Sequence, residues 1–586
     1  MRDFFTHFHF VVVGEIDALV KAGELPDGLD LTRVAVEPPR DPAHGDLSTN
    51  AAMILAKSAK MPPRDLAQKL AARLVEESDI TAADVAGPGF INLRIADAFW
   101  QARLIDILEA RTSYGDSELG QGRRVNVEYV SANPTGPMHA GHVRGAVLGD
   151  ALANLLEKAG FEVTREYYFN DAGAQVDVLA RTAYLRYREA LGEKIGEIPE
   201  GLYPGEYLKD VGAALVQRDG KKWLDKPEAE WLEPIRDFAV DYMMREIRSD
   251  LDLIGIKHSV FTNERELIQN GTLQQAFDIL DRKGLIYTGT LPPPKGKAME
   301  DWEPAELTLF RSSQFGDSTD RPLKKRDGGW AYIMPDIAYH FDKVRRGFRL
   351  MINVLGTDHG GYLERMRPAI AALSDGEAEL QVIFNNIVKV FRNGEPVKLS
   401  KRSGNLVTLR EMVEQVGAGA VRFMMLTRDP KSPLDFDFAK VIEQSKDNPV
   451  FYVQYAHARI SSVLRHARDE FSSHEIAPAQ LAKSNLSLLV DRDEIALVRL
   501  IAQWPSLAEG AAGSYEPHRV AFYLQEVAAA FHGLWNKGNA DATLRFIRSE
   551  AKPLTLARLA LVQAVAFVIA SGLHVMGVTP LEELRG

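Results

Sequence analysis

Two histidines that flank a glycine carry the first chemical signal in this sequence. His139, Gly141 and His142 lie between the apolar run VNVEYV (125–130) and the run HVRGAVLGDALANLLEKAG (142–160), so we expect a strand, a loop and a helix. A helix start offers free N–H groups and a partial positive charge to a phosphate, and a glycine lets the ligand approach the backbone. Two imidazoles at this spacing can donate hydrogen bonds to phosphate oxygens as charge develops there. The pattern is short, and the alternative is two loop histidines, one of which caps the helix.

A cationic segment follows much later in the chain. Lys398, Ser400 and Lys401 belong to the run KLSKRSGN (398–405), which combines two lysines with a hydroxyl and a glycine. A loop of this kind could close over a triphosphate and neutralise the departing pyrophosphate. The alternative is a solvated basic loop. The two signals in this order, on either side of an extended β-rich region, are far more specific than either one alone.

The elements around these residues indicate an α/β protein with flanking domains. The 586 residues are long enough for about three to four domains. Between 116 and about 444, β-rich and helical segments alternate, as in an open parallel sheet. Residues 1–115 mix helical patterns with short strands, and 445–586 are nearly all helical by pattern. The expected strands of the middle region are 125–130, 161–169, 351–356 and 380–390.

The composition excludes several classes of protein. With 70 basic and 81 acidic residues the net charge is −11, which argues against nonspecific coating of nucleic acid or anionic membrane. There are no cysteines, which excludes disulfides, thiolate zinc sites, iron–sulfur clusters and a cysteine nucleophile. The N-terminal run lacks a basic start, so we expect an amphipathic helix there. The apolar stretch 559–578 contains Gln563 and His574, and a buried bundle helix is the favoured interpretation over a membrane span.

The two signatures together resemble those of class I aminoacyl-tRNA synthetases, and their surroundings resemble arginyl-tRNA synthetases of bacterial type. The resemblance covers the whole chain. It rests on VEYVSANPTGPMHAGHVRGAVLGDALANLLEKAGFEVTREYYFNDAGAQ, FGDSTDRPLKKRDGGWAYIMPDIAYHFDK, GTDHGGYLERM and YVQYAHAR (452–459). It implies a class I Rossmann-like parallel sheet as the catalytic core, with an N-terminal α+β tRNA-binding domain and a C-terminal all-α anticodon-binding bundle. The implied domains are residues 1–115, 116–390 with the HAGH motif and insertions, 391–444 with the KLSKR loop and stem contacts, and 445–586.

The resemblance also implies an activity. The chain would activate L-arginine with ATP to arginyl-adenylate and pyrophosphate, and then transfer arginine to the 3′-terminal adenosine of its tRNA, with tRNA needed for activation. Mg²⁺ would arrive with ATP and no protein metal site is expected. A cytoplasmic monomer without membrane contact is expected. One alternative is an adenylyltransferase or ligase of a small metabolite that uses HxGH chemistry without tRNA, and another is a noncatalytic binding module.

The resemblance assigns the nucleotide and arginine residues. Carboxylates suit a permanent, planar guanidinium with five donors. The implied catalytic residues are His139, His142, Lys398 and Lys401, and the implied ATP-binding residues are these four with Gly141, Gly356 and Ser400. The implied arginine-binding residues are Glu128, Asn133, His142, Gln175, Tyr332 and Asp336, of which Tyr332 and Asp336 would share one face if their segment is helical.

The tRNA contacts implied by the resemblance come from both ends of the chain. Phe90 and Asn92 in GPGFINLRI match positions that read a tRNA base by stacking and amide hydrogen bonding; a core aromatic and a turn asparagine are the alternative. Tyr452, Tyr455 and Arg459 lie where the anticodon-binding bundle begins, and rings and guanidinium groups can stack on bases or hold phosphate. Alternate residues of that helix must face the core, so not all of its polar residues can touch RNA.

Overall fold

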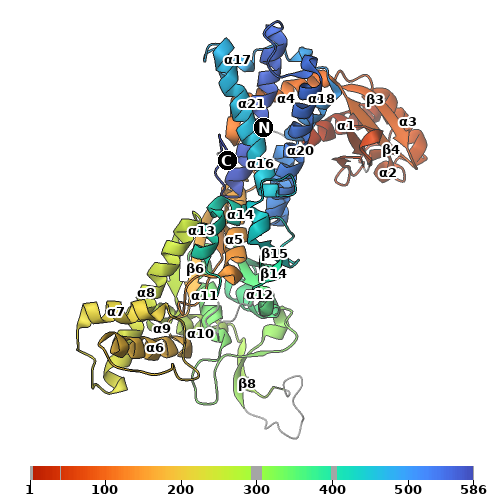
Figure 1. The fold of residues 1–586 in the computed structure, drawn as a ribbon. Coiled ribbons are helices and arrows are strands. Elements are labelled where there is room, and N and C mark those ends of the chain that lie inside the picture. The colour runs from red at the N-terminus through yellow and green to blue at the C-terminus, as the bar shows by residue number, and fades with distance from the viewer. Residues whose placement is uncertain (1–3, 40, 292–305, 398–405, 585–586) are drawn as a thin grey trace.

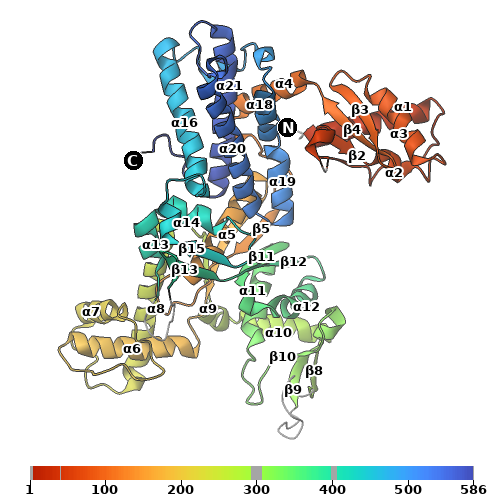
Figure 2. The same cartoon turned by 45° about the vertical axis from the view of Figure 1, so that its right-hand side comes forward.

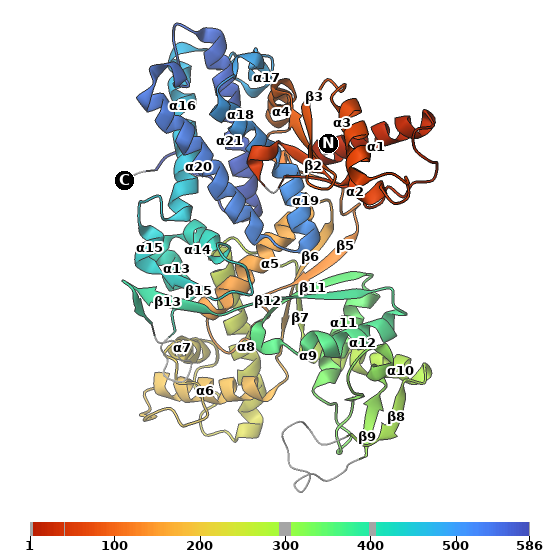
Figure 3. The same cartoon turned by 90° about the vertical axis from the view of Figure 1, so that its right-hand side faces the viewer.

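The computed structural model describes residues 4–39, 41–291, 306–397 and 406–584. Figure 1 shows the N-terminal module beside a tall helical bundle, with the parallel sheet below them both. Figure 3 shows two further groups of elements beneath the sheet, one built on α6–α8 and the other on α10, α12 and β8–β9. The N-terminal module, the helical bundle and these two groups of elements thus surround the sheet that precedes the histidine motif.

The N-terminal module packs helices on a four-stranded antiparallel sheet. Its first helix buries a residue every three to four positions (Phe4, Phe8, Val12, Ile16 and Leu19), which confirms the amphipathic helix expected at the N-terminus. The sheet order is β1-β2-β4-β3. The elements are α1 (Phe4–Lys21), β1 (Val36–Glu37), β2 (Leu47–Thr49), α2 (Ala51–Leu55), α3 (Pro63–Leu74), β3 (Ile80–Ala86), β4 (Phe90–Ile95) and α4 (Asp97–Ala110). Figure 2 shows α4 leading from this module to the bundle, where Gln101 Nε2 donates to the Leu489 carbonyl at 3.0 Å.

The central sheet has five parallel strands in the order β12-β11-β5-β6-β7, as the alternating pattern predicted. The order reverses beside β5, and helix α5 follows that strand directly. Open parallel sheets bind ligands beyond the carboxyl ends of their strands at such a reversal. The elements are β5 (Arg124–Glu128), α5 (Ala140–Lys158), β6 (Glu162–Phe169), β7 (Val260–Asn263), β11 (Leu350–Gly356), α12 (Tyr362–Ser374) and β12 (Glu379–Asn385).

Two insertions separate these strands. Helices α6 (Ala174–Ala190), α7 (Leu208–Asp219) and α8 (Glu228–Leu253) lie between β6 and β7. The second insertion lies between β7 and β11 and adds a small antiparallel sheet in the order β10-β9-β8. Its described elements are α9 (Glu264–Gln269), α10 (Thr272–Arg282), β8 (Ile286–Gly289), β9 (Leu307–Phe310), β10 (Arg321–Pro322) and α11 (Ile333–Arg345).

The run 380–390, expected as one strand, forms two strands in different sheets. It breaks at Asn386, whose backbone N–H donates to the Pro430 carbonyl at 2.8 Å and whose side chain donates to the Lys431 carbonyl at 2.9 Å. Beyond the break, β13 pairs in parallel with β15 and antiparallel with β14. An unbroken apolar run gives no sign of this tertiary anchor. The elements here are β13 (Val388–Arg392), β14 (Glu395–Pro396), α13 (Leu409–Val416), α14 (Ala418–Met425), β15 (Leu434–Asp437) and α15 (Phe438–Ile442).

The C-terminal region is helical, as its pattern predicted. It comprises α16 (Pro449–Glu470), α17 (Pro478–Leu481), α18 (Arg492–Ala502), α19 (Trp504–Ser514), α20 (His518–Ala540) and α21 (Lys552–Val575). Within the described residues α21 is the one helix long and apolar enough to cross a membrane, and 83% of its most apolar window is buried inside the structure. A helix buried by protein on most sides agrees with the expected bundle helix over 559–578.

A buried arginine joins the bundle to the central sheet. Arg422 on α14 donates from Nη2 to Asp150 Oδ2 at 2.5 Å, from Nε to the Met576 carbonyl at 2.8 Å and from Nη1 to the Ile254 carbonyl at 2.7 Å. Tyr129, at the end of the β5 segment, donates from its hydroxyl to the other oxygen of Asp150 at 3.1 Å. One guanidinium therefore holds the ends of α8 and α21 against helix α5.

Candidate active site

The histidine motif forms the N-terminal cap of α5. His139 is the cap residue, and its Nδ1 accepts a hydrogen bond from the Gly141 N–H at 3.2 Å. His142 Nδ1 accepts from the His139 N–H at 3.4 Å, and the two ring centroids lie 3.8 Å apart. The capping interpretation of one histidine is thus correct. It is compatible with phosphate binding, because both rings remain beside the helix N-terminus.

The loop that leads to this cap starts with unusual backbone geometry. Val130 and Ser131 have φ angles of 70° and 41°, in the left-handed region that non-glycine residues rarely adopt. Such strain is found mostly at functional sites, where the surrounding structure enforces it. Here it turns the chain sharply after β5, and Ser131 Oγ accepts from the Tyr168 N–H at 3.1 Å. The loop is therefore fixed to the neighbouring strand β6.

Residues 407–409, which follow the second signature in the chain, pair with the histidine motif. The Ala140 N–H donates to the Val407 carbonyl at 3.0 Å and the Leu409 N–H donates to the Met138 carbonyl at 2.9 Å. His139 and Thr408 form an isolated antiparallel bridge. Lys398, Ser400 and Lys401 lie outside the described residues. The segment that follows them is nevertheless paired with the histidine motif, which is the arrangement a shared nucleotide site requires.

A buried carboxylate stands at the carboxyl end of β5. Glu128 Oε2 lies 2.7 Å from Lys343 Nζ, and both side chains are almost entirely buried. Ser131 Oγ donates to Glu128 Oε1 at 3.1 Å. Lys343 also approaches Asn353 Oδ1 at 3.4 Å. Contacts from Lys343 and Ser131 hold the Glu128 carboxylate in one orientation.

Tyr332 and Asp336 lie at the start of α11, in the helical spacing that the sequence predicted. Tyr332 is the residue before the helix and is 85% exposed, whereas Asp336 in the first turn is partly buried. Burial, together with the carboxylates of Glu128 and Glu264, raises the pKa of Asp336 to about 7. Among the described residues Asp336 forms no ion pair. An incompletely neutralised carboxylate of this kind favours a cationic ligand.

Asn133 and Gln175 are brought together by the fold. Asn133 Nδ2, in the loop after β5, donates to Gln175 Oε1, in the first turn of α6, at 3.0 Å. The Asn170 side chain caps the following turn by accepting from the Ala172 and Gly173 N–H groups at 3.0 and 2.8 Å. Two of the residues assigned to arginine are thus in direct contact.

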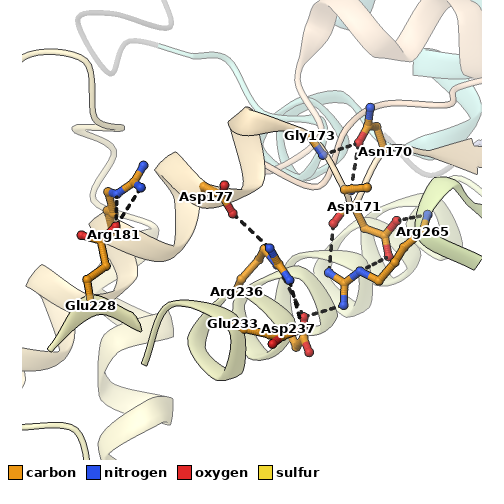
Figure 4. Close-up of polar contacts among 11 residues, drawn as sticks. Asn170, Asp171, Gly173, Asp177, Arg181, Glu228, Glu233, Arg236, Asp237 and Arg265 are labelled. Atoms are coloured by element: carbon orange, nitrogen blue, oxygen red, sulfur yellow. Dashed lines mark hydrogen bonds and ion pairs between the residues drawn. The ribbon is translucent and has the colours of Figure 1, made fainter. Parts of the chain in front are cut away.

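The neighbouring Asp171 belongs to an ion-pair network drawn in Figure 4. Asp171 Oδ1 accepts from the Arg265 backbone N–H at 2.9 Å, and Arg265 Nη1 lies 2.7 Å from Asp237 on α8. Arg236 on α8 in turn contacts Asp177 on α6 at 3.2 Å. This network fixes α6, α8 and the start of α9 relative to one another beneath the carboxyl ends of β6 and β7.

Gly356 ends β11 at the same edge of the sheet. It is paired with Asn385, the last residue of β12, whose side chain would lie 3.2 Å from a Cβ added at Gly145 on α5. The helix therefore packs closely on the strand ends. Gly356, from a much later part of the chain, thus lies at the same edge of the sheet as Glu128, Asn133 and the histidine motif.

The two residues assigned to a tRNA base in the N-terminal module differ in exposure. Phe90 starts β4 and is 42% exposed, whereas Asn92, two residues later, is 7% exposed. Phe90 is therefore not a core aromatic residue, and its exposed ring can accept a stacked base. Asn92 is a buried residue within β4 and not the turn asparagine of the alternative interpretation.

The polar residues of α16 divide into two faces, as expected. Arg459 Nη2 donates to the Tyr455 hydroxyl at 2.8 Å and Arg459 Nη1 contacts His532 on α20 at 3.0 Å, while the Tyr452 ring lies 4.5 Å from the His532 ring. These side chains are partly exposed. On the other face Gln454 and His457 are buried and bind backbone groups of residues 579 and 581. The partly exposed face is the one able to meet RNA.

Sequence reasoning missed the residues that support the carboxylates. Lys343, His340 and Tyr168 carry no motif of their own, although Lys343 and His340 lie within the quoted run HFDK. His340 is fully buried, and its Nδ1–H donates to the Asp336 carbonyl at 2.9 Å. Burial lowers the pKa of His340 to about 4. Among the described residues no group of three or more His, Cys, Asp or Glu is arranged to hold a metal ion.

Three family models match successive parts of the chain. They are described as the arginyl tRNA synthetase N-terminal domain (residues 15–95), the catalytic domain of class I (R) tRNA synthetases (residues 103–435) and the DALR anticodon binding domain (residues 453–584). The chain is 60% identical to the arginine–tRNA ligase of Parvibaculum lavamentivorans and 55% identical to that of Ruegeria pomeroyi. Each alignment covers 581 residues, 99% of this chain and 100% of the relative.

Solved structures show the same fold. The arginyl-tRNA synthetase of Thermus thermophilus matches with a TM-score of 0.68 at 22% identity, covering 98% of this chain and 100% of that one. A putative arginyl-tRNA synthetase from Campylobacter jejuni matches with a TM-score of 0.71 at 29% identity, covering 84% of this chain and 100% of that one.

The parallel sheet, the histidine cap on α5 and the matched catalytic domain define a class I aminoacyl-tRNA synthetase. The matched domains lie in the same order along the chain as the N-terminal module, the sheet region and the bundle. Within that class, the chain belongs to the arginyl-tRNA synthetase family.

Proposed function

We propose that this chain joins L-arginine to its tRNA. In the first step the arginine carboxylate attacks the α-phosphate of ATP, which yields arginyl-adenylate and pyrophosphate. In the second step the 3′-terminal adenosine of tRNA takes the arginyl group and AMP leaves. The observation that carries the proposal is the meeting of a histidine-capped helix N-terminus with clustered carboxylates at one edge of a parallel sheet.

The ATP side of the site is assigned to the start of α5 and to residues 398–401 of the second signature. Negative charge grows on the phosphoryl oxygens and on the departing pyrophosphate, so catalysis depends on positioning and electrostatic stabilisation. His139 and His142 serve the α-phosphate, with Gly141 between them. Lys398 and Lys401 neutralise the pyrophosphate, with Ser400 beside them and Gly356 on the nucleotide side. Mg²⁺ enters as the ATP complex.

The arginine side is assigned to the carboxylates and amides around β5. Asp336 faces the guanidinium, with Tyr332 beside it. Burial and the carboxylates of Glu128 and Glu264 raise the pKa of Asp336, so a bound cation would stabilise its ionised form. Glu128, fixed by Lys343, serves the α-ammonium side with Asn133 and Gln175. An amino acid with a neutral side chain would bury these carboxylates without a cation to pair with them. The desolvation cost of doing so favours arginine over such a substrate.

The tRNA is assigned to the exposed surfaces at both ends of the chain. Phe90 stacks on a base and Asn92 serves it through its amide, while Tyr452, Tyr455 and Arg459 contact the anticodon arm. Residues 445–586 contain equal numbers of basic and acidic residues, so the acidic surplus lies elsewhere. RNA binding then depends on individual cations and rings rather than on net charge. The enzyme acts as a monomer in the cytoplasm.

The alternative readings lose support from the matched domains. An adenylyltransferase that acts on a small metabolite has no use for an anticodon-binding domain, which here matches residues 453–584. A noncatalytic binding module is disfavoured because the histidine motif keeps its cap geometry.

Exchange of radiolabelled pyrophosphate into ATP tests the function. We expect exchange that requires arginine and also requires the cognate tRNA. The activity would be refuted if no exchange occurred with arginine, whether tRNA is present or absent. The tRNA requirement would be refuted if exchange were equally fast with and without tRNA. K401A should lower the rate by on the order of 100-fold or more. The control K389A removes an exposed lysine from β13 and should leave the rate unchanged.

A further inference from the structure

A tyrosine of the first insertion contacts the loop that carries the histidine motif. Tyr207 directly precedes helix α7, and its hydroxyl donates to the Thr135 carbonyl at 2.6 Å. Thr135 lies in the β5–α5 loop (residues 129–139), which joins the end of β5 to the histidine cap of α5. The two residues are 72 positions apart in the chain, so neither signature motif points to this contact.

The β5–α5 loop connects the two halves of the proposed site. On the arginine side, Asn133 Oδ1 accepts from the Asn170 N–H at 3.3 Å. On the ATP side, His139 forms the cap of α5. Tyr207 binds the loop between these two anchors, and it does so from a separate part of the fold.

Two glycines leave room for the Tyr207 side chain. A Cβ added at Gly205, two residues earlier, would overlap the ring. A Cβ added at Gly136 would lie 3.1 Å from the hydroxyl oxygen and 3.3 Å from the carbon that bears it. The ring therefore lies between the backbone of the insertion and the backbone of the loop, and close packing on both sides restricts it to one orientation.

The insertion holds Tyr207 in place. Leu208, the next residue, is fully buried, and Glu206, the preceding one, lies 3.6 Å from Arg186 on α6. Helix α7 packs on α6 beneath the sheet (Figure 3). Burial raises the pKa of Tyr207, so its hydroxyl keeps the proton that it donates. The hydroxyl is thus a preorganised donor for the loop.

The place of this contact determines which step it can affect. Adenylate formation requires the arginine carboxylate and the α-phosphate of ATP to come within about 3–3.5 Å in the correct alignment. Asn133 and His139 keep their own anchors when the middle of the loop moves, so each substrate can still bind. A shift of the loop changes the position of one bound substrate relative to the other, which alters kcat more than either KM.

We propose that Tyr207 is a positioning residue for adenylate formation: its hydroxyl and ring hold the β5–α5 loop so that the two bound substrates meet in a reactive geometry. The inference rests on the proposed function, since it takes adenylate formation as the reaction. It gives the insertion of α6–α8 a part in the first chemical step.

The main test is Y207F in the full-length enzyme, which removes the hydroxyl and keeps the ring. Exchange of radiolabelled pyrophosphate into ATP is measured with saturating cognate tRNA while arginine and ATP are varied in turn. We expect kcat to fall on the order of 10-fold, because a small misplacement of reacting groups is costly. The KM values for arginine and ATP should stay close to those of the wild type.

Y184F is the matched control. Tyr184 on α6 is another partly buried tyrosine of the same insertion, and its hydroxyl donates to the Trp223 carbonyl at 3.1 Å. The substitution removes the same kind of hydrogen bond, but that bond stays within the insertion. We expect Y184F and Y207F to lower the melting temperature to a similar, small extent, and only Y207F to lower kcat.

A double-mutant cycle with G136A isolates the contact itself. Gly136 does not have a positive φ, so its backbone accepts alanine, but the added methyl group would press on the Tyr207 hydroxyl. G136A should therefore lower kcat. Because both changes act on one contact, Y207F/G136A should lose less activity than the product of the two separate losses.

Hydrogen–deuterium exchange tests the position of the loop without any need for activity. Peptides that cover residues 131–141 should exchange faster in Y207F than in the wild type, and Y184F should match the wild type in this region.

Several outcomes would overturn the inference. One is a Y207F enzyme with the wild-type kcat, and another is a loss of kcat in Y184F as large as that in Y207F. Independent, multiplicative losses in the double-mutant cycle, or unchanged deuterium exchange of the loop in Y207F, would also contradict it. A wild-type enzyme without arginine-dependent exchange would refute the proposed function instead, and deuterium exchange would still decide whether Tyr207 holds the loop.

Discussion

Replacement of Arg422 by methionine tests whether the buried hydrogen bonds of Arg422 support both the stability of the protein and the geometry of the site. The side chain makes three hydrogen bonds, to the carboxylate of Asp150 at 2.5 Å and to the carbonyls of Met576 and Ile254 at 2.8 and 2.7 Å. Methionine fills a similar volume and makes none of them. Because Asp150 also holds the Tyr129 hydroxyl, the change reaches the residue next to Glu128.

The cost follows from the charge that is left behind. Removing one member of a buried ion pair destabilises a protein by about 3–5 kcal/mol, since the remaining charge is uncompensated. Here Arg165 stays 3.7 Å from Asp150 and offsets part of that charge. The two carbonyls lose their donors as well, each at a cost of about 1–3 kcal/mol. These contributions share one site and do not add, so we expect a loss of about 3–5 kcal/mol.

Chemical denaturation of R422M, monitored by fluorescence, measures the loss of stability. Pyrophosphate exchange by the same variant measures the effect on the site. The control R428M removes an exposed arginine a few residues later and should cost less than about 0.5 kcal/mol. The double variant D150N/R422M removes the stranded charge and should be more stable than R422M. The reasoning is wrong if R422M costs no more than R428M, or if D150N/R422M is as unstable as the sum of the two single changes.

Three other predictions concern the arginine site, the buried Glu128–Lys343 pair and tRNA binding. Because the pKa of Asp336 is about 7, its carboxyl group is neutral below that value, and the KM for arginine should fall as the pH rises from 6 to 8. D336N should remove this pH dependence and raise the KM for arginine while leaving the KM for ATP unchanged. A pH profile that D336N does not change would contradict the assignment. K343M leaves Glu128 buried without its cation and should cost about 3–5 kcal/mol of stability in a thermal or chemical melt, whereas a near-neutral change would show that the pair is dispensable. F90A removes an exposed ring and should raise the KM for tRNA by about 5-fold or more at unchanged melting temperature, and an unaltered tRNA KM would exclude stacking there.

The local hydrophobic pattern of the sequence predicted several helices and strands correctly. The strand and helix around the histidine motif follow from an apolar run and an amphipathic run, and the structure has β5 and α5 there. The same holds for α1 and for the buried helix α21. The split of 380–390 was missed, because Asn386 is anchored by carbonyls of Pro430 and Lys431, which the local sequence does not contain.

The candidate site was predicted only as far as the family resemblance reached. It supplied Glu128 and Asn133, which lie at and just after the end of β5, and Asp336, which lies in the first turn of α11. It supplied neither Lys343 nor Tyr168, because a pair such as Glu128 and Lys343 exists only once β5 and α11 have packed together. No spacing rule connects residues so distant in sequence.

The backbone pairing between residues 138–140 and 407–409 has a consequence for biosynthesis. All five strands of the central sheet, and both histidines, precede residue 407 in the chain. A nascent chain can therefore complete the sheet on the ribosome before the partner of the histidine loop has been made. Contacts between segments this distant form late, because the intervening chain must first be ordered. A translation product truncated before residue 407 would contain every strand of the sheet yet lack the backbone partner of the histidine loop, so that pairing is completed only in the last third of synthesis.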